Sequence, residues 1–397
     1  MEFKLDMMQT AAVAVVMYYL GEWIKNKFPV LHKFCIPGPV VGGIIFALVN
    51  TLLKVNGILT LSMDTTLQTP FMMVFFTTIG FTASIDLVKK GGMQVIVFWI
   101  CAAALAALQD GVGVAIAKAL GAHPLLGIIA GSATMTGGHG TGAAFAPMFE
   151  EMGLKGAMTA AMAAATWGLV FGSLIGGPVA KRLIEKKNLK SSVQANANNA
   201  AATTADEEVI SYEELFKAFT IVLVAIGVGA ILEKFFKGMG ITLPSYVNSM
   251  IIAAIILNVG EGTGKLKVNQ KCMDVIGSIG LNVFLSMALI SLKLWELADV
   301  AGPMLVILIV QTVMMFIFAT FITFNFTGKD YDAAVMAAGH CGFGMGATPV
   351  AMANMRSVVE RFGAAPRAFF VLPIVGAFLI DFANSLIITA FANVFGK

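Results

Sequence analysis

Charged residues are scarce in this sequence. Asp, Glu, Lys and Arg make up only 12% of the 397 residues, about half of their usual share in a soluble domain. Apolar residues make up 58%, and many of their runs approach the roughly 20 residues with which a helix crosses a bilayer. The alternating segments of about ten residues that indicate a transmembrane barrel are missing. The composition therefore predicts an all-α polytopic membrane protein.

Cysteines and basic clusters are scarce as well. The four cysteines share no metal-ligand spacing, and we interpret them as small apolar side chains. No cofactor is implied. The net charge is only +3, and no basic run is interleaved with aromatics, which argues against a nucleic-acid partner. The N-terminus lacks a basic segment and a cleavage site before its apolar run, which favours an uncleaved first span over a signal peptide.

Ten apolar segments are predicted to be membrane spans. A polar linker at residues 185–212 separates five of them from the other five. Ser211 and Glu214, at the end of this linker, have the spacing of a capping box that begins the sixth span. The predicted spans are residues 7–24, 36–54, 67–87, 93–117 and 156–180 before the linker, and 215–236, 243–259, 273–292, 300–325 and 367–394 after it.

Two more apolar segments, at residues 124–150 and 333–356, are rich in glycine. Four glycines lie between Gly137 and Gly142, and four between Gly339 and Gly346. Because each glycine costs a helix interior about 1 kcal/mol relative to alanine, neither segment is expected to be one unbroken helix. Broken backbone is tolerated in a membrane only where protein buries it or where it lines a wet cavity. We therefore predict two re-entrant hairpins at a polar site, although glycines also permit close helix packing.

The distribution of basic residues predicts the orientation of the chain. If both glycine-rich segments enter and leave on one side and both termini lie outside, 18 Lys and Arg residues face the cytoplasm and 8 face outward. Each half then holds five spans and one hairpin, so residues 1–184 and 213–397 form inverted repeats. Short similarities agree, since Phe75–Gly80 occupies the same place in its half as Leu285–Ile290 does in the other. Transporters of this plan bind their ligands near the midplane, at the repeat interface.

Polar residues within the predicted spans are candidates for ion binding. Asp381 lies midway along the last span, and two further oxygen-bearing side chains follow it at i+3 and i+4, a cluster that suits a hard cation. Amides in the fourth and ninth spans lie at matching depths. The alternative for both groups is structural hydrogen bonding between helices. The sodium candidates are Asp381, Asn384, Ser385, Gln109, Asp110 and Gln311.

The glycine-rich segments supply the candidates for substrate binding. Helix N-termini carry about half a positive charge and unpaired N–H groups, which suit a carboxylate. Pro349 fits the first turn of a helix that leaves the second break. His139 and His340 suggest a proton relay or a structural hydrogen bond, and snorkelling is favoured for Arg356. The substrate candidates are Ser132, Thr134, Thr136, Gly137, Gly138, His139, Gly140, Thr141, Gly142, Gly342, Gly344, Gly346, Thr348 and Asn354.

Two motifs resemble those of a known family. Ser132–Phe145, with the core Gly-Gly-His-Gly-Thr-Gly-Ala-Ala, resembles the first signature of the glutamate:sodium symporter family, and Ala337–Met355 resembles the second. The resemblance covers nearly the whole chain outside the linker. It implies sodium-driven glutamate uptake through the bacterial inner membrane by a homodimer, in which a transport domain that carries both hairpins slides past a scaffold as an elevator. Met135, Thr136 and Asp110 depart from the Leu, Ser and amide expected in the family.

Three alternative functions are open at this point. A sodium-coupled carrier for another small carboxylate would have the same kind of site, because helix N-termini recognise anionic groups generically. An intramembrane enzyme could use His139 or His340 as a base and the glycine N–H groups as an oxyanion hole, but no nucleophile with an oriented base stands out. A passive channel lacks the expected ring of like charges.

Overall fold

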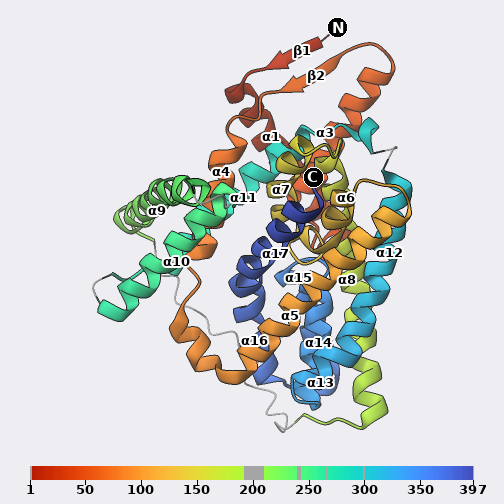
Figure 1. The fold of residues 1–397 in the computed structure, drawn as a ribbon, viewed down its shortest axis with the longest axis vertical. Helices are drawn as coiled ribbons and strands as arrows, with labels where there is room; N and C mark the ends of the chain where they lie inside the picture. Colours follow the sequence, from red (N-terminus) through yellow and green to blue (C-terminus); the bar gives the residue numbers. More distant parts are fainter. Residues whose placement is uncertain (1, 192–209, 239–242, 265, 298–299, 397) are drawn as a thin grey trace.

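A computed structural model describes residues 2–191, 210–238, 243–264, 266–297 and 300–396 (Figure 1). Most of these residues are helical. The two strands β1 (Glu2–Leu5) and β2 (Thr60–Met63) pair in parallel near the N-terminus. The all-α class is therefore confirmed, with one small two-stranded sheet added within the described part of the chain.

The first half of the chain forms helices where its spans are predicted. The helix that contains the fourth predicted span begins at Ile85, earlier than predicted, and it kinks at Gly92, whose φ is 60°. The glycine-rich segment is divided into two helices around a π-helical turn, η1 (Ile129–Ala133). The elements are α1 (Met7–Lys27), α2 (Pro29–Lys33), α3 (Gly38–Val55), α4 (Gln68–Gly80), α5 (Ile85–Ala119), α6 (Pro124–Ile128), α7 (Gly138–Glu151) and α8 (Ala157–Lys187).

The second half also forms helices where its spans are predicted. Two of its helices contain π-helical turns, η3 (Ala319–Thr323) and η4 (Val375–Leu379), and the short 3-10 helix η2 (Leu294–Glu296) follows the eleventh helix. The second glycine-rich segment is again a pair of helices. The elements are α9 (Tyr212–Gly238), α10 (Ser245–Thr263), α11 (Gln270–Ile290), α12 (Ala301–Phe318), α13 (Phe324–Phe326), α14 (Tyr331–Phe343), α15 (Thr348–Phe362), α16 (Pro366–Ile374) and α17 (Ile380–Phe395).

Seven helices of the described residues are long and apolar enough to cross a membrane, which makes the chain a multi-pass membrane protein. They belong to α3, α5, α8, α9, α10, α11 and the continuous run from α12 to α13. The other three predicted spans coincide with α1, the shorter α4, and α16 with η4 and α17. The number of ten spans stays a prediction.

Local capping explains where several helices begin. Asp6 and Gln9 form a capping box at α1. The predicted cap of α9 is confirmed, because the Glu214 N–H donates to Ser211 Oγ at 3.2 Å. Asp330 caps α14 by accepting from the Ala333 N–H at 2.9 Å.

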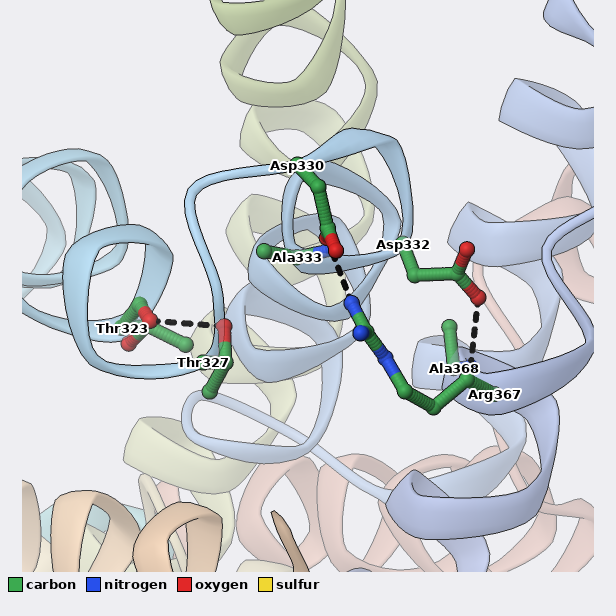
Figure 2. A network of polar contacts seen from close by, with 7 residues as sticks. All are labelled: Thr323, Thr327, Asp330, Asp332, Ala333, Arg367 and Ala368. Carbon is green, nitrogen blue, oxygen red and sulfur yellow. Dashed lines mark hydrogen bonds and ion pairs between the residues drawn. The ribbon is translucent and has the colours of Figure 1, made fainter. Parts of the chain in front are cut away.

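An ionic contact joins the beginning of α14 to the beginning of α16 (Figure 2). The carboxylate of Asp330, which caps α14, also pairs with Arg367 on α16. Two residues further along, Asp332 accepts from the Ala368 N–H at 3.1 Å. These contacts fix the starting point of the second hairpin relative to the last membrane helix.

The helices pack in two groups. In the first group, α1, α3, α4, α9, α10 and α11 pack on one another, with α3 on α11 and α10 on α4, so that corresponding helices of the two halves make corresponding contacts. The second group contains α5 to α8 and α12 to α17. In Figure 1, α9 and α10 lie at the left, and α8 and α12 at the right. The groups meet where α4, α10 and α11 contact α7, η4 and α17.

The two glycine-rich hairpins begin at opposite ends of the molecule. The α6–α7 pair begins and ends near the C-terminus, where Gly396 lies beside Leu125 and Met152 (Figure 1). The α14–α15 pair begins and ends at the other end, where the Tyr331 hydroxyl donates to the Gly363 carbonyl and Ser191 Oγ donates to the Ala364 carbonyl. Their breaks therefore approach one another from opposite directions.

A close helix contact gives a stability prediction. A Cβ at Gly21 on α1 would lie 2.7 Å from the Gly42 nitrogen on α3, so Gly21→Ala should force the helices apart at a cost of about 1–3 kcal/mol. Gly227→Ala on α9 is the matched control, because nothing lies within 4 Å of its Cβ position. Tryptophan fluorescence during denaturation in detergent should show a lower unfolding temperature only for Gly21→Ala. Equal unfolding of both variants would contradict this contact.

Candidate functional site

The breaks in the two glycine-rich hairpins touch each other. In the first hairpin, the helix unwinds at Gly131 and a turn at residues 134–137 precedes α7. In the second, α14 ends at Phe343 and α15 starts at Thr348. Gly138 has a φ of 63°, and a Cβ at this position would lie 2.7 Å from the Gly346 carbonyl oxygen. Only a glycine fits this backbone and this approach, so the prediction that both segments are broken helices is confirmed.

A cavity of about 270 Å³ opens where the two breaks meet. The first turns of α7 and α15 both line it, and a helix N-terminus is where backbone N–H groups lack partners within the helix. Pro349 occupies the first turn of α15, as predicted. The hairpin residues in the lining are Thr136, Gly137, Gly138, His139, Gly140, Thr141, Phe343, Gly346, Ala347, Thr348 and Pro349.

The opposite wall of the cavity comes from the first helix group. It is largely apolar, with Phe75 and Phe76 from α4 and Leu281 and Leu285 from α11, and Asn282 adds one amide. We did not predict these residues as part of the site. Phe75, Phe76 and Leu285 lie in the Phe75–Gly80 and Leu285–Ile290 segments, whose short similarity is their signal in the sequence, and the helices that contain these segments pack directly on each other. Leu281 and Asn282 have no such signal.

Gln109 on α5 connects the two breaks. Its Nε2 donates to the Gly344 carbonyl at 2.7 Å, and its Oε1 accepts from Thr136 Oγ1 at 2.7 Å. Gln311 on α12 donates to the Gln109 carbonyl at 2.7 Å. The two amides that the sequence places at matching depths are thus hydrogen-bonded neighbours. Gln109 holds the breaks in register from behind the cavity rather than lining it.

A buried carboxylate lies beside the unwound part of the first hairpin. Asp110 is fully buried, and its two oxygens accept from the Ser132 N–H at 2.7 Å and from Ser132 Oγ at 2.9 Å. Asn384 on α17 donates to the Ser132 carbonyl at 3.0 Å, and its own Oδ1 is buried without a hydrogen-bond partner among the described residues. No Lys or Arg of the described residues forms an ion pair with Asp110. An anion in such a place requires a cation or a proton.

A second carboxylate lies at the cavity itself. Asp381 on α17 is part of the lining, whereas Asn384 and Ser385, which follow it on the helix, are buried behind it. Ser385 Oγ donates to the Asp381 carbonyl at 2.8 Å and lies 3.4 Å from the Tyr246 hydroxyl. A shared sodium-binding role for the three residues stays a prediction. Asp381 faces the cavity, and Asn384 faces Ser132 and the Asp110 region.

The remaining predicted residues support the backbone of the hairpins. Thr134 Oγ1 donates to the Ile129 carbonyl, and Asn354 donates to the carbonyls of Gly172 and Ala338, away from the cavity lining. Gly342 lets α14 approach α15, since a Cβ there would lie 2.8 Å from the Val350 carbonyl carbon. Gly142 packs against Thr134 and Ala161.

The two histidines make different contacts. His139 lines the cavity and its Nε2 lies 3.1 Å from Thr166 Oγ1 on α8. His340 is fully buried among Phe98, Phe318 and Phe343, and its Nδ1 lies 2.7 Å from Thr323 Oγ1. The two rings thus belong to separate hydrogen-bonded pairs, and the roles of the two histidines stay predictions.

The sequence comparisons decide the family. The family model described as "Sodium/glutamate symporter" matches residues 3–364. The sodium/glutamate symporter of Escherichia coli (strain K12) is 41% identical over 389 residues, which are 97% of this chain and 97% of the relative. That of Haemophilus influenzae (strain ATCC 51907 / DSM 11121 / KW20 / Rd) is 41% identical over 395 residues, which are 98% of this chain and 97% of the relative.

The chain belongs to the sodium/glutamate symporter family. Membership confirms the resemblance drawn from the two glycine-rich motifs, which now prove to form the cavity between the hairpins. The members that match are named for transport, which favours a carrier over the enzyme alternative. Within this sodium/glutamate symporter family member, the helix N-termini and the two carboxylates are the groups with the chemistry to bind an amino-acid anion and a cation.

Proposed function

We propose that this protein imports glutamate together with sodium. The observation that carries the proposal is that two helix N-termini, those of α7 and α15, face one cavity that a carboxylate also lines. Each N-terminus provides about half a positive charge and unpaired N–H groups. A dicarboxylic amino acid has two groups that match two such ends. The names of the related symporters agree with this ligand.

The hydroxyls at the cavity can bind the rest of the substrate. Thr348 Oγ1 donates to the Gly376 carbonyl at 2.7 Å, and Thr136 Oγ1 donates to Gln109 Oε1. Because a hydroxyl has one proton and two lone pairs, both oxygens keep acceptor capacity. They can accept from the substrate ammonium once their own protons are engaged. The apolar wall of α4 and α11 would cover the methylene groups.

Two sodium positions follow from the two carboxylates. At the first, Asp110 accepts from Ser132 at the unwound backbone that follows Gly131, and Asn384, whose Oδ1 is unpaired among the described residues, donates to the Ser132 carbonyl. Oxygen ligands of this kind suit a hard cation. At the second, Asp381 faces the cavity itself. Gln311 Oε1, buried without a partner in the described part of the chain, is a further acceptor near the first position.

The coupling has a simple energetic basis. Moving one elementary charge through 100 mV is worth about 2.3 kcal/mol. Glutamate carries one net negative charge near neutral pH, so its import with a single sodium moves no net charge. Two or more sodium ions would let the membrane potential add to the sodium gradient. The proposal of two carboxylate-based positions is consistent with that stoichiometry.

The architecture that we propose for transport has ten spans, two re-entrant hairpins and two inverted repeats, residues 1–184 and 213–397, joined by the cytoplasmic linker 185–212. The corresponding contacts of α3 with α11 and α10 with α4 support it. The group that contains both hairpins would move as an elevator past the group of α1, α3, α4, α9, α10 and α11. Both termini would lie outside the inner membrane, and the protein would act as a homodimer.

Uptake by reconstituted protein tests the function. Proteoliposomes with an imposed inward sodium gradient should accumulate radiolabelled glutamate, and a potassium or choline gradient should not replace sodium. Glutamate uptake that ignores sodium would contradict symport. Accumulation of another small carboxylate without glutamate would select the related carrier function, and chemical change of glutamate without transfer would favour an enzyme.

Replacement of Asp381 by asparagine should raise the half-saturating sodium concentration about fivefold. The carboxylate lies at a cavity that water can enter, where one charge pair at about 4 Å is worth about 1 kcal/mol. Uptake measured over a range of sodium concentrations checks this value. An unchanged sodium dependence together with a raised KM for glutamate would instead assign Asp381 to the substrate ammonium.

A further inference from the structure

Two cavities flank the last turns of α8, and neither shares a lining residue with the substrate cavity. One, of about 640 Å³, lies between α8 and α15, and the other, of about 360 Å³, lies between α8 and the run from α12 to α13. Arg182 and Lys186 line both of them. The two hollows are therefore neighbouring compartments that share two cations.

The cavity walls are strongly basic. Lys181 and Arg361 line the larger cavity, and Lys187 lines the smaller one, in addition to the two shared cations. Glu185 is the one carboxylate in either lining, and it lies 4.0 Å from Lys181. A cluster with such an excess of cations is expected to attract a multiply charged anion.

The position of the cluster adds a second requirement. The apolar part of α8 ends at Ala180, and the basic residues follow at once. Beside them, the side chains of Ile317 and Phe321 are 50% and 61% exposed on the outward surface of α12 and η3. The Lys187 ammonium lies 5.3 Å from the centre of the Phe324 ring, which brings the two surfaces together. The occupant must thus meet cations and apolar side chains at the edge of the membrane.

We propose that these cavities form a binding site for an anionic phospholipid. Its phosphates would lie among Arg182, Lys186 and the flanking cations, with acyl chains along Ile317 and Phe321. Basic pockets between membrane helices at this level suit lipid headgroups, and arginine binds phosphate oxygens in pairs. Because two compartments share two cations, a headgroup with two phosphates, as in cardiolipin, fits better than one with a single phosphate.

The site is independent of the substrate that the protein carries. All of its residues belong to α8, α12, η3, α13 and α15, which are helices of the group that holds the hairpins. A lipid bound here would contact that group and leave α4 and α11 untouched. Lipid binding can be measured without transport, so failure of glutamate uptake would not affect the test.

Native mass spectrometry of the full-length protein in detergent tests the site. The protein is titrated with cardiolipin, phosphatidylglycerol or phosphatidylethanolamine. Each basic residue near an anionic lipid contributes about a fivefold gain in binding, so Arg182→Gln with Lys186→Gln should weaken cardiolipin binding about thirtyfold. Arg361→Gln alone should weaken it about fivefold. The charge-matched control, Lys90→Gln with Lys217→Gln, replaces exposed lysines outside both cavities and should bind like the unchanged protein.

Several results would overturn the proposal. One is equal cardiolipin binding by the double variant and its control. Another is binding of the zwitterionic phosphatidylethanolamine to the unchanged protein as strong as that of cardiolipin. Displacement of cardiolipin by millimolar inorganic phosphate would identify a site for a free anion. Stronger binding of phosphatidylglycerol than of cardiolipin would overturn the two-phosphate assignment. Unfolding temperatures of the variants within about 2 °C of the unchanged protein would show that the substitutions leave the fold intact.

Discussion

Replacing Asp110 by asparagine is expected to lower sodium-driven glutamate uptake about a hundredfold. The Asp110 carboxylate is fully buried, and its two oxygens accept hydrogen bonds from the Ser132 N–H and the Ser132 Oγ. Hydrogen bonds and ion contacts of a charged group are worth about 1.5–3 kcal/mol, which corresponds to a loss of roughly tenfold to a hundredfold or more. Asparagine can still accept from the Ser132 N–H, so the fold of the hairpin should survive.

Sodium protection against unfolding gives this prediction a readout besides transport. A ligand that binds only the folded state raises its stability in proportion to the logarithm of its concentration. Sodium, compared with choline, should therefore raise the unfolding temperature of the unchanged protein more than that of Asp110→Asn. Asp86→Asn is the control, because Asp86 lies on the same helix with an exposed carboxylate 3.8 Å from Lys89. If Asp110→Asn keeps its sodium protection, Asp110 is no sodium ligand.

The second large effect is expected for Gly138→Ala, which should reduce glutamate uptake more than a hundredfold. The φ of 63° at Gly138 disfavours any residue with a Cβ. The added methyl group would also lie 2.7 Å from the Gly346 carbonyl oxygen, at a direct contact between the two breaks. The hairpins would have to separate, and the two helix N-termini would no longer face the same ligand.

Gly92→Ala separates these two causes. Gly92 also has a positive φ, 60°, with a ψ of −152°, but nothing lies within 4 Å of its Cβ position. It should lower stability by about 1–2 kcal/mol through backbone strain alone and leave the half-saturating glutamate concentration unchanged. Equal uptake by the Gly138→Ala and Gly92→Ala proteins would contradict the contact between the breaks.

Most helices were predictable because apolar length and glycine density are strong local signals. The long apolar run at residues 300–325 became α12 to α13, and the glycine-rich segments became pairs of helices. The start of α5 was predicted too late because α5 continues through the kink at Gly92 from a short piece that contains Asp86, Lys89 and Lys90. The short α4 ends at Gly80, where Phe81 begins a turn, and no apolar pattern marks that end.

The candidate site was predictable only in part. Glycine density identified the two breaks, and matching depth identified Gln109 and Gln311, which are hydrogen-bonded neighbours. The direction in which each side chain points was not predictable, because it depends on packing between distant helices. Ser132 points toward Asp110 and not into the cavity. The phenylalanine and leucine wall had no polar signature that could distinguish it from lipid-facing residues.

That apolar wall has a mechanical consequence. Hydrogen bonds have a preferred length and direction, whereas dispersion contacts between phenyl rings and leucine methyl groups depend little on register. Phe75, Phe76, Leu281 and Leu285 therefore present a smooth surface to the hairpins. A helix group that carries its ligands along such a surface would replace one set of dispersion contacts by a similar set. No intermediate position would then be strongly stabilised. The polar contacts between the hairpins and the bound ligands would then persist during the whole movement.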